Sequence, residues 1–126
     1  MFNQNLVKLV VDLVKKEKLI LMDEGDSDLV RHNFSKKLIM SSFLNGIILE
    51  DKELYPENPN LKHKGKNYYC INKYKESFLS LRTILISFII KNQVIIFHVS
   101  PLNYGSREER FYRKNIQKFK ELFHQE

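Results

Sequence analysis

The chain has 126 residues, of which 43% are hydrophobic and 29% are charged, a composition that excludes a disordered segment and favours one globular domain. Its one cysteine, Cys70, excludes an internal disulfide and a zinc site built from several cysteines. The formal net charge is +6, but residues 1–61 carry a net −2 and residues 62–126 carry a net +8. We therefore expect one face that binds an anionic partner. The alternative is an ordinary basic protein whose lysines are solvated.

The first segment predicts a helix over residues 5–16. Apolar residues recur on one face at helical spacing, at positions 6, 10, 13 and 14. Lys8 and Asp12 interrupt the apolar run, so we read no signal peptide. Residues 18–23, with the sequence KLILMD, either extend this helix or form a short strand.

A second helix is expected over residues 28–45. Asp26 or Ser27 offers an N-cap for it, and Gly46 fits its C-terminal end. Residues 28–55 also fit two short helices followed by a winged hairpin, although the acidic surroundings count against contact with DNA there.

Strand signals dominate the middle of the chain. The sequences GIILED, at residues 46–51, and NYYCINKY, at residues 67–74, favour strands on either side of a long polar connection. The clearest β pattern covers residues 78–100, where two β-branched runs flank a polar turn at residues 91–93. Both faces of this hairpin are apolar, so we expect it at the centre of the sheet or in a homodimer contact.

The C-terminal segment predicts an amphipathic helix. Pro101 ends the preceding strand, and Ser106 with Glu109 forms a capping box at the start of the helix. Its buried stripe is expected to consist of Tyr112, Ile116, Phe119 and Phe123. Residues 1–126 therefore predict a single α+β domain with two N-terminal helices, an antiparallel sheet of three to five strands with a long apolar hairpin, and a C-terminal amphipathic helix.

A cluster of lysines and tyrosines between positions 62 and 75 is the first candidate site. Lysines neutralise phosphates and tyrosines offer flat faces for stacked bases, so such a cluster suits a nucleic acid or a nucleotide. The alternative is a solvated loop that runs into a strand with half-buried tyrosines. The candidate residues are Lys62, Lys64, Lys66, Tyr68, Lys73, Tyr74 and Lys75.

The last helix is the second candidate site, because cations are dense along it. Arginine pairs with phosphate through a planar fork, and residues three or four positions apart share one side of a helix. Arg107 lies in the first turn, where it and the helix N-terminus could hold an anion together. The alternative is an amphipathic helix with an ordinary basic outer side. The candidate residues are Arg107, Arg110, Arg113, Lys114 and Lys118.

A third candidate site depends on the register of the hairpin. With a turn centred on Asn92, His98 lies near Ile86. One face would then carry the candidate catalytic residues Ser80, Arg82, His98 and Ser100. A histidine that moves protons beside an arginine that stabilises the phosphorane could cleave RNA without a metal, as in a toxin-like ribonuclease. A register slip of one residue would dissolve this cluster.

Three functions are open from the sequence. The leading expectation is binding of a nucleic acid or other phosphate-bearing anion through the C-terminal half. The alternatives are the metal-independent ribonuclease and a phage- or plasmid-encoded inhibitor that binds a host protein. The lack of alanine and the abundance of lysine, isoleucine, asparagine and phenylalanine suit an AT-rich genome. We expect a cytoplasmic protein with no cofactor, no metal site and no membrane contact.

Overall fold

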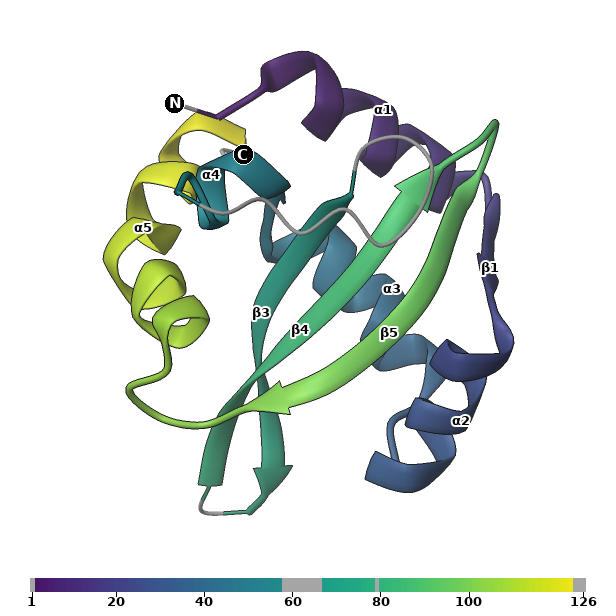
Figure 1. The fold of residues 1–126 in the computed structure, drawn as a ribbon, viewed down its shortest axis with the longest axis vertical. Coiled ribbons are helices and arrows are strands. Elements are labelled where there is room, and N and C mark those ends of the chain that lie inside the picture. Colours follow the sequence, from purple (N-terminus) through teal and green to yellow (C-terminus); the bar gives the residue numbers. More distant parts are fainter. Residues whose placement is uncertain (1, 58–66, 79, 124–126) are drawn as a thin grey trace.

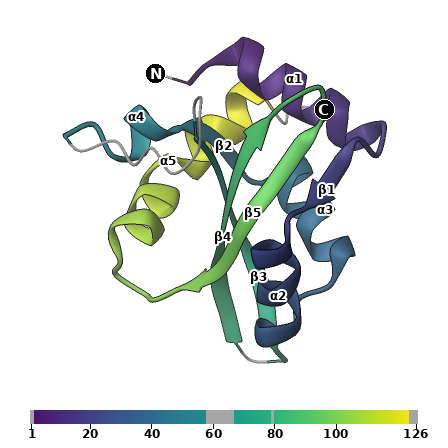
Figure 2. The same ribbon diagram turned by 45° about the vertical axis from the view of Figure 1, so that its right-hand side comes forward.

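The computed structural model describes residues 2–57, 67–78 and 80–123, which form one sheet flanked by helices (Figures 1 and 2). The helices are α1 (Gln4–Lys15), α2 (Asp23–His32), α3 (Lys36–Asn45), α4 (Asp51–Leu54) and α5 (Arg107–Phe123). The strands are β1 (Leu19–Leu21), β2 (Ile47–Glu50), β3 (Tyr68–Ser77), β4 (Ser80–Ile90) and β5 (Val94–Leu102). The expected α+β class with a C-terminal helix is confirmed. No helix in these three ranges combines the length and the apolar composition needed to cross a membrane.

The sheet contains five strands in the order β1-β5-β4-β3-β2. The four strands β2 to β5 pair antiparallel with one another, whereas β1 pairs with β5 in parallel and places Leu19 opposite Val94. The number of strands lies in the expected range and four of them form the expected antiparallel sheet, but the parallel edge strand β1 was not expected. Residues 19–21 form a parallel edge strand. A run of three residues carries too little periodicity to predict that it pairs with β5.

β4 lies at the centre of the sheet, and its residues 83–89 are all buried. In the turn to β5, Asn92 occupies the left-handed region with φ 60°, and the Lys91 amide donates to the Gln93 carbonyl at 3.0 Å. The homodimer contact expected through this hairpin stays a prediction. Much of the apolar surface of the hairpin is covered by other elements of the same chain.

Helices cover both faces of the sheet (Figures 1 and 2). On one face, α1 and α3 pack together, and Phe43 of α3 meets Phe88 of β4 edge-on with ring centroids 5.1 Å apart. On the other face, α5 lies against β2 and β3. Its Phe119 is fully buried and contacts Phe2 at a centroid distance of 5.0 Å. α5 therefore has one apolar side against the sheet and one side in solvent.

The single helix expected over residues 28–45 is wrong, because α2 and α3 replace it. Asn33 adopts the left-handed conformation, with φ 56° and ψ 43°, and this ends α2. Ser35 then caps α3, since its Oγ accepts the Leu38 amide at 3.1 Å. Asparagine is one of the few residues that visit the left-handed region readily, so the sequence HNFS marks the break.

α2 also begins earlier than expected. Its N-cap is Met22, whose amide donates to the Ile96 carbonyl of β5 at 2.8 Å, so the helix starts where β1 leaves the sheet and not at Asp26 or Ser27. Gly25, in the first turn, passes close to β5, where a Cβ atom would lie 3.0 Å from the Ile96 carbonyl oxygen. After α3, β2 pairs with β3, so residues 28–55 do not form a winged hairpin.

Replacing Asn33 by alanine is expected to destabilise the fold, because alanine occupies the left-handed region at a steric cost that glycine does not incur. The expected loss is about 1 kcal/mol of unfolding free energy for Asn33→Ala, whereas Asn33→Gly should retain the stability of the natural chain. Urea denaturation followed by circular dichroism measures both variants. Equal stability of the alanine and glycine variants would contradict a left-handed Asn33.

Candidate anion-binding surface

α5 presents its cations to solvent because its other side is packed on the sheet. Tyr112 is 4% exposed and makes a hydrogen bond with the main chain of Lys73 in β3. Burial is the main cause that raises the pKa of the Tyr112 phenol. The predicted apolar stripe faces the sheet, with Tyr112 and Phe119 buried and Ile116 and Phe123 half-buried.

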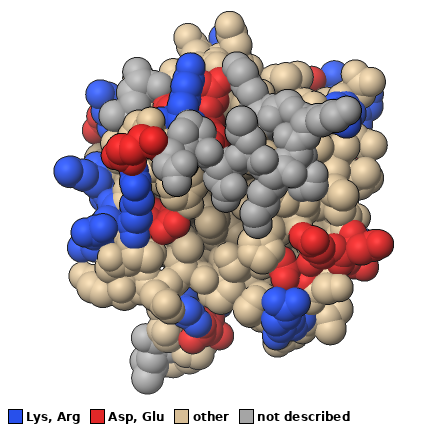
Figure 3. Space-filling view, in the orientation of Figure 1, with Lys and Arg blue, Asp and Glu red and all other residues tan. Residues whose placement is uncertain are grey.

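The outer side of α5 carries a row of three exposed cations, Arg110, Lys114 and Lys118. Their spacing of four residues places them along one side of the helix. Within the part of the chain that the structure describes, none of the three forms an ion pair. Arg110 and Lys114 line an open depression of about 340 Å³ together with Arg113. Figure 3 shows Lys and Arg side chains gathered on the side of the molecule where α5 lies.

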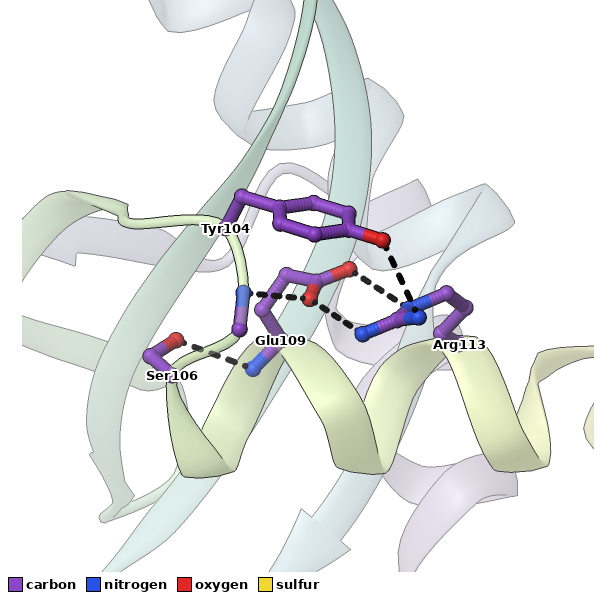
Figure 4. Close-up of polar contacts among 5 residues, drawn as sticks. Tyr104, Ser106, Glu109 and Arg113 are labelled. Carbon is purple, nitrogen blue, oxygen red and sulfur yellow. Dashed lines mark hydrogen bonds and ion pairs between the residues drawn. The ribbon is translucent and has the colours of Figure 1, made fainter.

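Arg113 lies beside this row and is held by two neighbours (Figure 4). Its Nε donates to Oε2 of Glu109 at 3.2 Å, and its Nη2 donates to Oε1 at 3.0 Å. Its Nη1 donates to the phenol oxygen of Tyr104 at 3.3 Å, and the guanidinium carbon lies 4.8 Å from the centre of the Tyr104 ring. Arg113 therefore links a carboxylate on the helix to an aromatic ring in the loop before it.

Glu109 is the buried end of this cluster, with 4% of its surface exposed. Its carboxylate accepts the Gly105 amide at 2.9 Å, while its own amide donates to Ser106 Oγ at 3.3 Å. The Gly105 amide, and after it Arg113, hold the pKa of the Glu109 carboxyl below its usual range despite burial. The predicted capping box is therefore half formed, because Ser106 caps the helix but Glu109 reaches Gly105 instead of Ser106.

Arg113 and Tyr104 also border a pocket of about 250 Å³ that extends to the strands. Its walls include Lys73 of β3 and the apolar side chains of Leu81 and Leu102. Lys73 comes from the first predicted basic segment and Arg113 from the second, so the two segments meet at this pocket. The resulting group, called the basic surface from here on, consists of Lys73, Arg110, Arg113, Lys114 and Lys118.

Other residues of the first predicted segment lie elsewhere. Tyr74 contacts Phe34 edge-on at a centroid distance of 5.3 Å and lines, with Lys75, a separate groove of about 660 Å³ next to α3. Tyr68 is half-buried and packs against Phe88 at 5.7 Å. Burial is the main cause that raises the pKa of both phenols. The remaining predicted residues, Lys62, Lys64 and Lys66, lie outside the described residues.

Arg107, at the start of α5, already has an anionic partner. Its Nη2 lies 2.7 Å from Oε2 of Glu57, and its guanidinium carbon lies 5.5 Å from the centre of the Tyr55 ring. Tyr55 in turn donates its hydroxyl proton to Oε2 of Glu108 at 2.7 Å. These contacts tie the start of α5 to the segment that follows α4. An anion expected at Arg107 would have to compete with Glu57.

The shared face predicted for the catalytic candidates is wrong, because β5 contains a bulge. Near the turn the register is the expected one, with Phe88 opposite Ile96, but His98 lies opposite Ser87 and not Ile86. β5 advances from Ile96 to His98 while β4 moves by one residue. Such an insertion transfers the side chains beyond it to the opposite face of the pair.

Ser80 and Arg82 consequently lie on one face of the sheet, while His98 and Ser100 lie on the other. Arg82 is opposite Tyr74 and forms an ion pair with Glu76 at 2.8 Å. The ribonuclease hypothesis therefore loses the geometry that it requires.

His98 belongs to a hydrogen-bonded network at the edge of β5. Its Nδ1 lies 2.7 Å from Oδ2 of Asp28, a residue of α2 that is 2% exposed. The same oxygen accepts the Val99 amide at 2.9 Å, and Arg31 lies 3.4 Å from Oδ1. Asp28 thus satisfies the main chain of β5 beyond the residues that pair with β1. Across the described ranges, no group of three His, Cys, Asp or Glu side chains could hold a metal ion.

Tyr104 lies beside the basic surface, and the sequence did not indicate it. The sequence LNYGS predicts a loop and says nothing about which side chain the tyrosine meets. A partial signal exists in the spacing of Glu109 and Arg113, since four residues separate a helical ion pair. The ring position depends on where that arginine points.

Glu109→Gln is expected to lower stability at neutral pH, and this loss should fade in acid. Because the folded-state pKa of Glu109 lies below its unfolded value, the ionised carboxylate stabilises the fold above about pH 5, and the contribution is lost as the pH falls through the folded pKa. Thermal denaturation across this pH range compares both proteins, with Glu121→Gln on the exposed side of α5 as the control. A difference that stays constant with pH would contradict the assignment.

Comparisons with protein-family models, with curated proteins and with solved structures found no match to this chain. The function proposed for the basic surface therefore rests on its charge and its exposure.

Proposed function

We propose that this chain binds a nucleic acid or another phosphate-bearing polyanion through the basic surface. The observation that carries the proposal is the row Arg110, Lys114 and Lys118, which is exposed and forms no ion pair among the described residues. Like charges four residues apart destabilise a helix by about 0.2–0.5 kcal/mol per pair. An anion bound along the row would offset this repulsion, because each cation would then lie close to a negative charge.

The row differs from other arginines of the chain, which have acidic partners. Arg82 and Arg107 each meet a glutamate, at 2.8 and 2.7 Å, and Arg113 is paired with Glu109 at 3.0 Å. Their charges are therefore compensated within the molecule. Among the described residues, no acidic side chain pairs with the row, so its charge remains available to a partner. The row belongs to the half of the chain that carries a net +8.

The length of the row favours a polymer over a single phosphate. Arg110 and Lys118 are eight residues apart, which at about 1.5 Å per residue corresponds to about 12 Å along α5. Lys73 and Arg113 extend the surface sideways to β3. A chain of phosphates can contact several of these cations at once and displace the counter-ions condensed on it, which makes the binding dependent on salt.

The triple variant Arg110→Ala/Lys114→Ala/Lys118→Ala is expected to lose affinity for a fluorescently labelled oligonucleotide by at least about tenfold at low salt. The slope of log affinity against log salt concentration should fall by about 2, since each phosphate contact contributes about 0.7–0.9. Fluorescence anisotropy at several salt concentrations measures both quantities.

The matched control removes the same number of exposed cations, three lysines, from the helices on the other face, as Lys8→Ala/Lys36→Ala/Lys37→Ala. This control has the same net charge as the triple variant of α5. If the location of the cations on the surface matters, the control should bind as the natural chain does. An equal loss in both triple variants would show that net charge alone attracts the oligonucleotide. A natural chain that binds no oligonucleotide at low salt would overturn the proposed function.

Lys114→Glu is expected to stabilise the fold while weakening binding. The substitution replaces two repulsions, with Arg110 and Lys118, by two attractions, and should add about 1 kcal/mol of unfolding free energy at low salt. Lys114→Gln removes the repulsions only and should give a smaller gain. Urea denaturation and anisotropy on the same samples measure the two effects, and a variant that loses both stability and binding would contradict this expectation.

A further inference from the structure

We propose that Tyr104 stacks on one unpaired base and that the preferred partner of this chain is a single-stranded nucleic acid. The inference rests on the proposed function, because the phosphates of the same strand would lie on the basic surface. What it adds is a contact with the base, which charge alone does not supply.

The first observation is that Tyr104 is exposed and yet held in place. It is 83% exposed, although tyrosine rings usually bury much of their apolar surface. The guanidinium carbon of Arg113 lies 4.8 Å from the ring centre, and Nη1 of Arg113 donates to the phenol oxygen at 3.3 Å (Figure 4). A base could therefore stack on the open part of a ring whose position is already set, with little entropy lost.

The second observation is that Arg113 is itself anchored. Two hydrogen bonds, at 3.2 and 3.0 Å, attach its guanidinium to Glu109, whose carboxylate is buried and bonded to the Gly105 amide. Gly105 has φ 83°, a conformation that side chains rarely allow, and it turns the chain between Tyr104 and α5. The ring is thus connected to the body of the protein through a chain of defined contacts.

The third observation is the surroundings of the ring. Tyr104 lines the pocket of about 250 Å³ together with Lys73, the apolar side chains of Leu81 and Leu102, and the Glu109–Arg113 ion pair. Arg110 and Lys114 continue from Arg113 along α5. An aromatic ring close to apolar side chains and to several cations matches a nucleotide, whose base is flat and apolar on its faces and whose phosphates are anionic.

A duplex does not offer its bases in this way. Bases inside a double helix are stacked on one another, so an exposed ring reaches a base only where the strand is unpaired. The same chemistry is offered by single-stranded DNA and by single-stranded RNA, and both are tested with homopolymers of pyrimidines.

The test compares Tyr104→Leu, which removes the ring, with Tyr104→Phe, which keeps it. Fluorescence anisotropy is measured with labelled oligothymidylate, oligouridylate, an abasic strand of equal length and charge, and a hairpin duplex. Tyr104→Leu should weaken binding of the two base-containing single strands by about fivefold or more, with an unchanged salt dependence. It should leave the abasic strand and the duplex unaffected. Tyr104→Phe keeps the ring and its contact with the Arg113 guanidinium but loses the hydroxyl, so it should bind the single strands more tightly than Tyr104→Leu does.

The matched control is Phe78→Leu, which removes an aromatic ring that is 95% exposed in the turn between β3 and β4. It should bind all four probes as the natural chain does, and circular dichroism should show that both leucine variants are folded. Equal binding of the natural chain and Tyr104→Leu to the single strands would overturn the inference while leaving the proposed function intact. No binding of any probe by the natural chain would overturn the proposed function as well.

Discussion

Burial of β4 on both faces is the constraint that places the other elements. Its residues 83–89 are all buried, so the strand needs a partner on each side and a covering layer above and below. α1 and α3 form one layer, and α5 contributes to the other. Because α5 turns its aromatic stripe toward β2 and β3, the side that carries Arg110, Lys114 and Lys118 is left in solvent. The exposed charge of this helix is therefore a direct result of how the sheet is covered.

Two buried carboxylates accept hydrogen bonds from main-chain amides that would otherwise lack a partner. Asp28 accepts the Val99 amide at the edge of β5, and Glu109 accepts the Gly105 amide before α5. A buried carboxylate is costly unless it is bonded and paired. Each of these two is also close to an arginine, at 3.4 Å for Asp28 and at 3.0 Å for Glu109. The same electrostatic requirement is therefore met at both carboxylates.

The basic surface combines groups of different rigidity. Lys73, Lys114 and Lys118 are exposed side chains with long flexible stems, which suit a polyanion of variable path. Arg113 and Tyr104 are held through Glu109, so they lose less conformational entropy on binding. In the proposed function, the flexible cations supply most of the attraction to phosphates. The further proposal for Tyr104 adds a preference of the ring for an unpaired base.

Features that depend on neighbouring residues in the chain could be predicted from the sequence. Apolar spacing was sufficient to predict the α+β class, the buried stripe of α5 around Tyr112 and Phe119, and the outward side of the same helix, because a helix repeats within a few residues. The turn around Asn92 was recognisable for the same reason, since polar residues interrupt two β-branched runs.

Features that join distant segments were settled only in the folded chain. The parallel pairing of β1 with β5, the bulge that separates Arg82 from His98, and the position of Tyr104 beside Arg113 each depend on which elements pack together. A hydrophobic pattern tells which side of an element is buried, but it does not name the partner. One additional residue in a strand moves every following side chain to the other face, so a cluster predicted from an uninterrupted register is lost when the strand bulges.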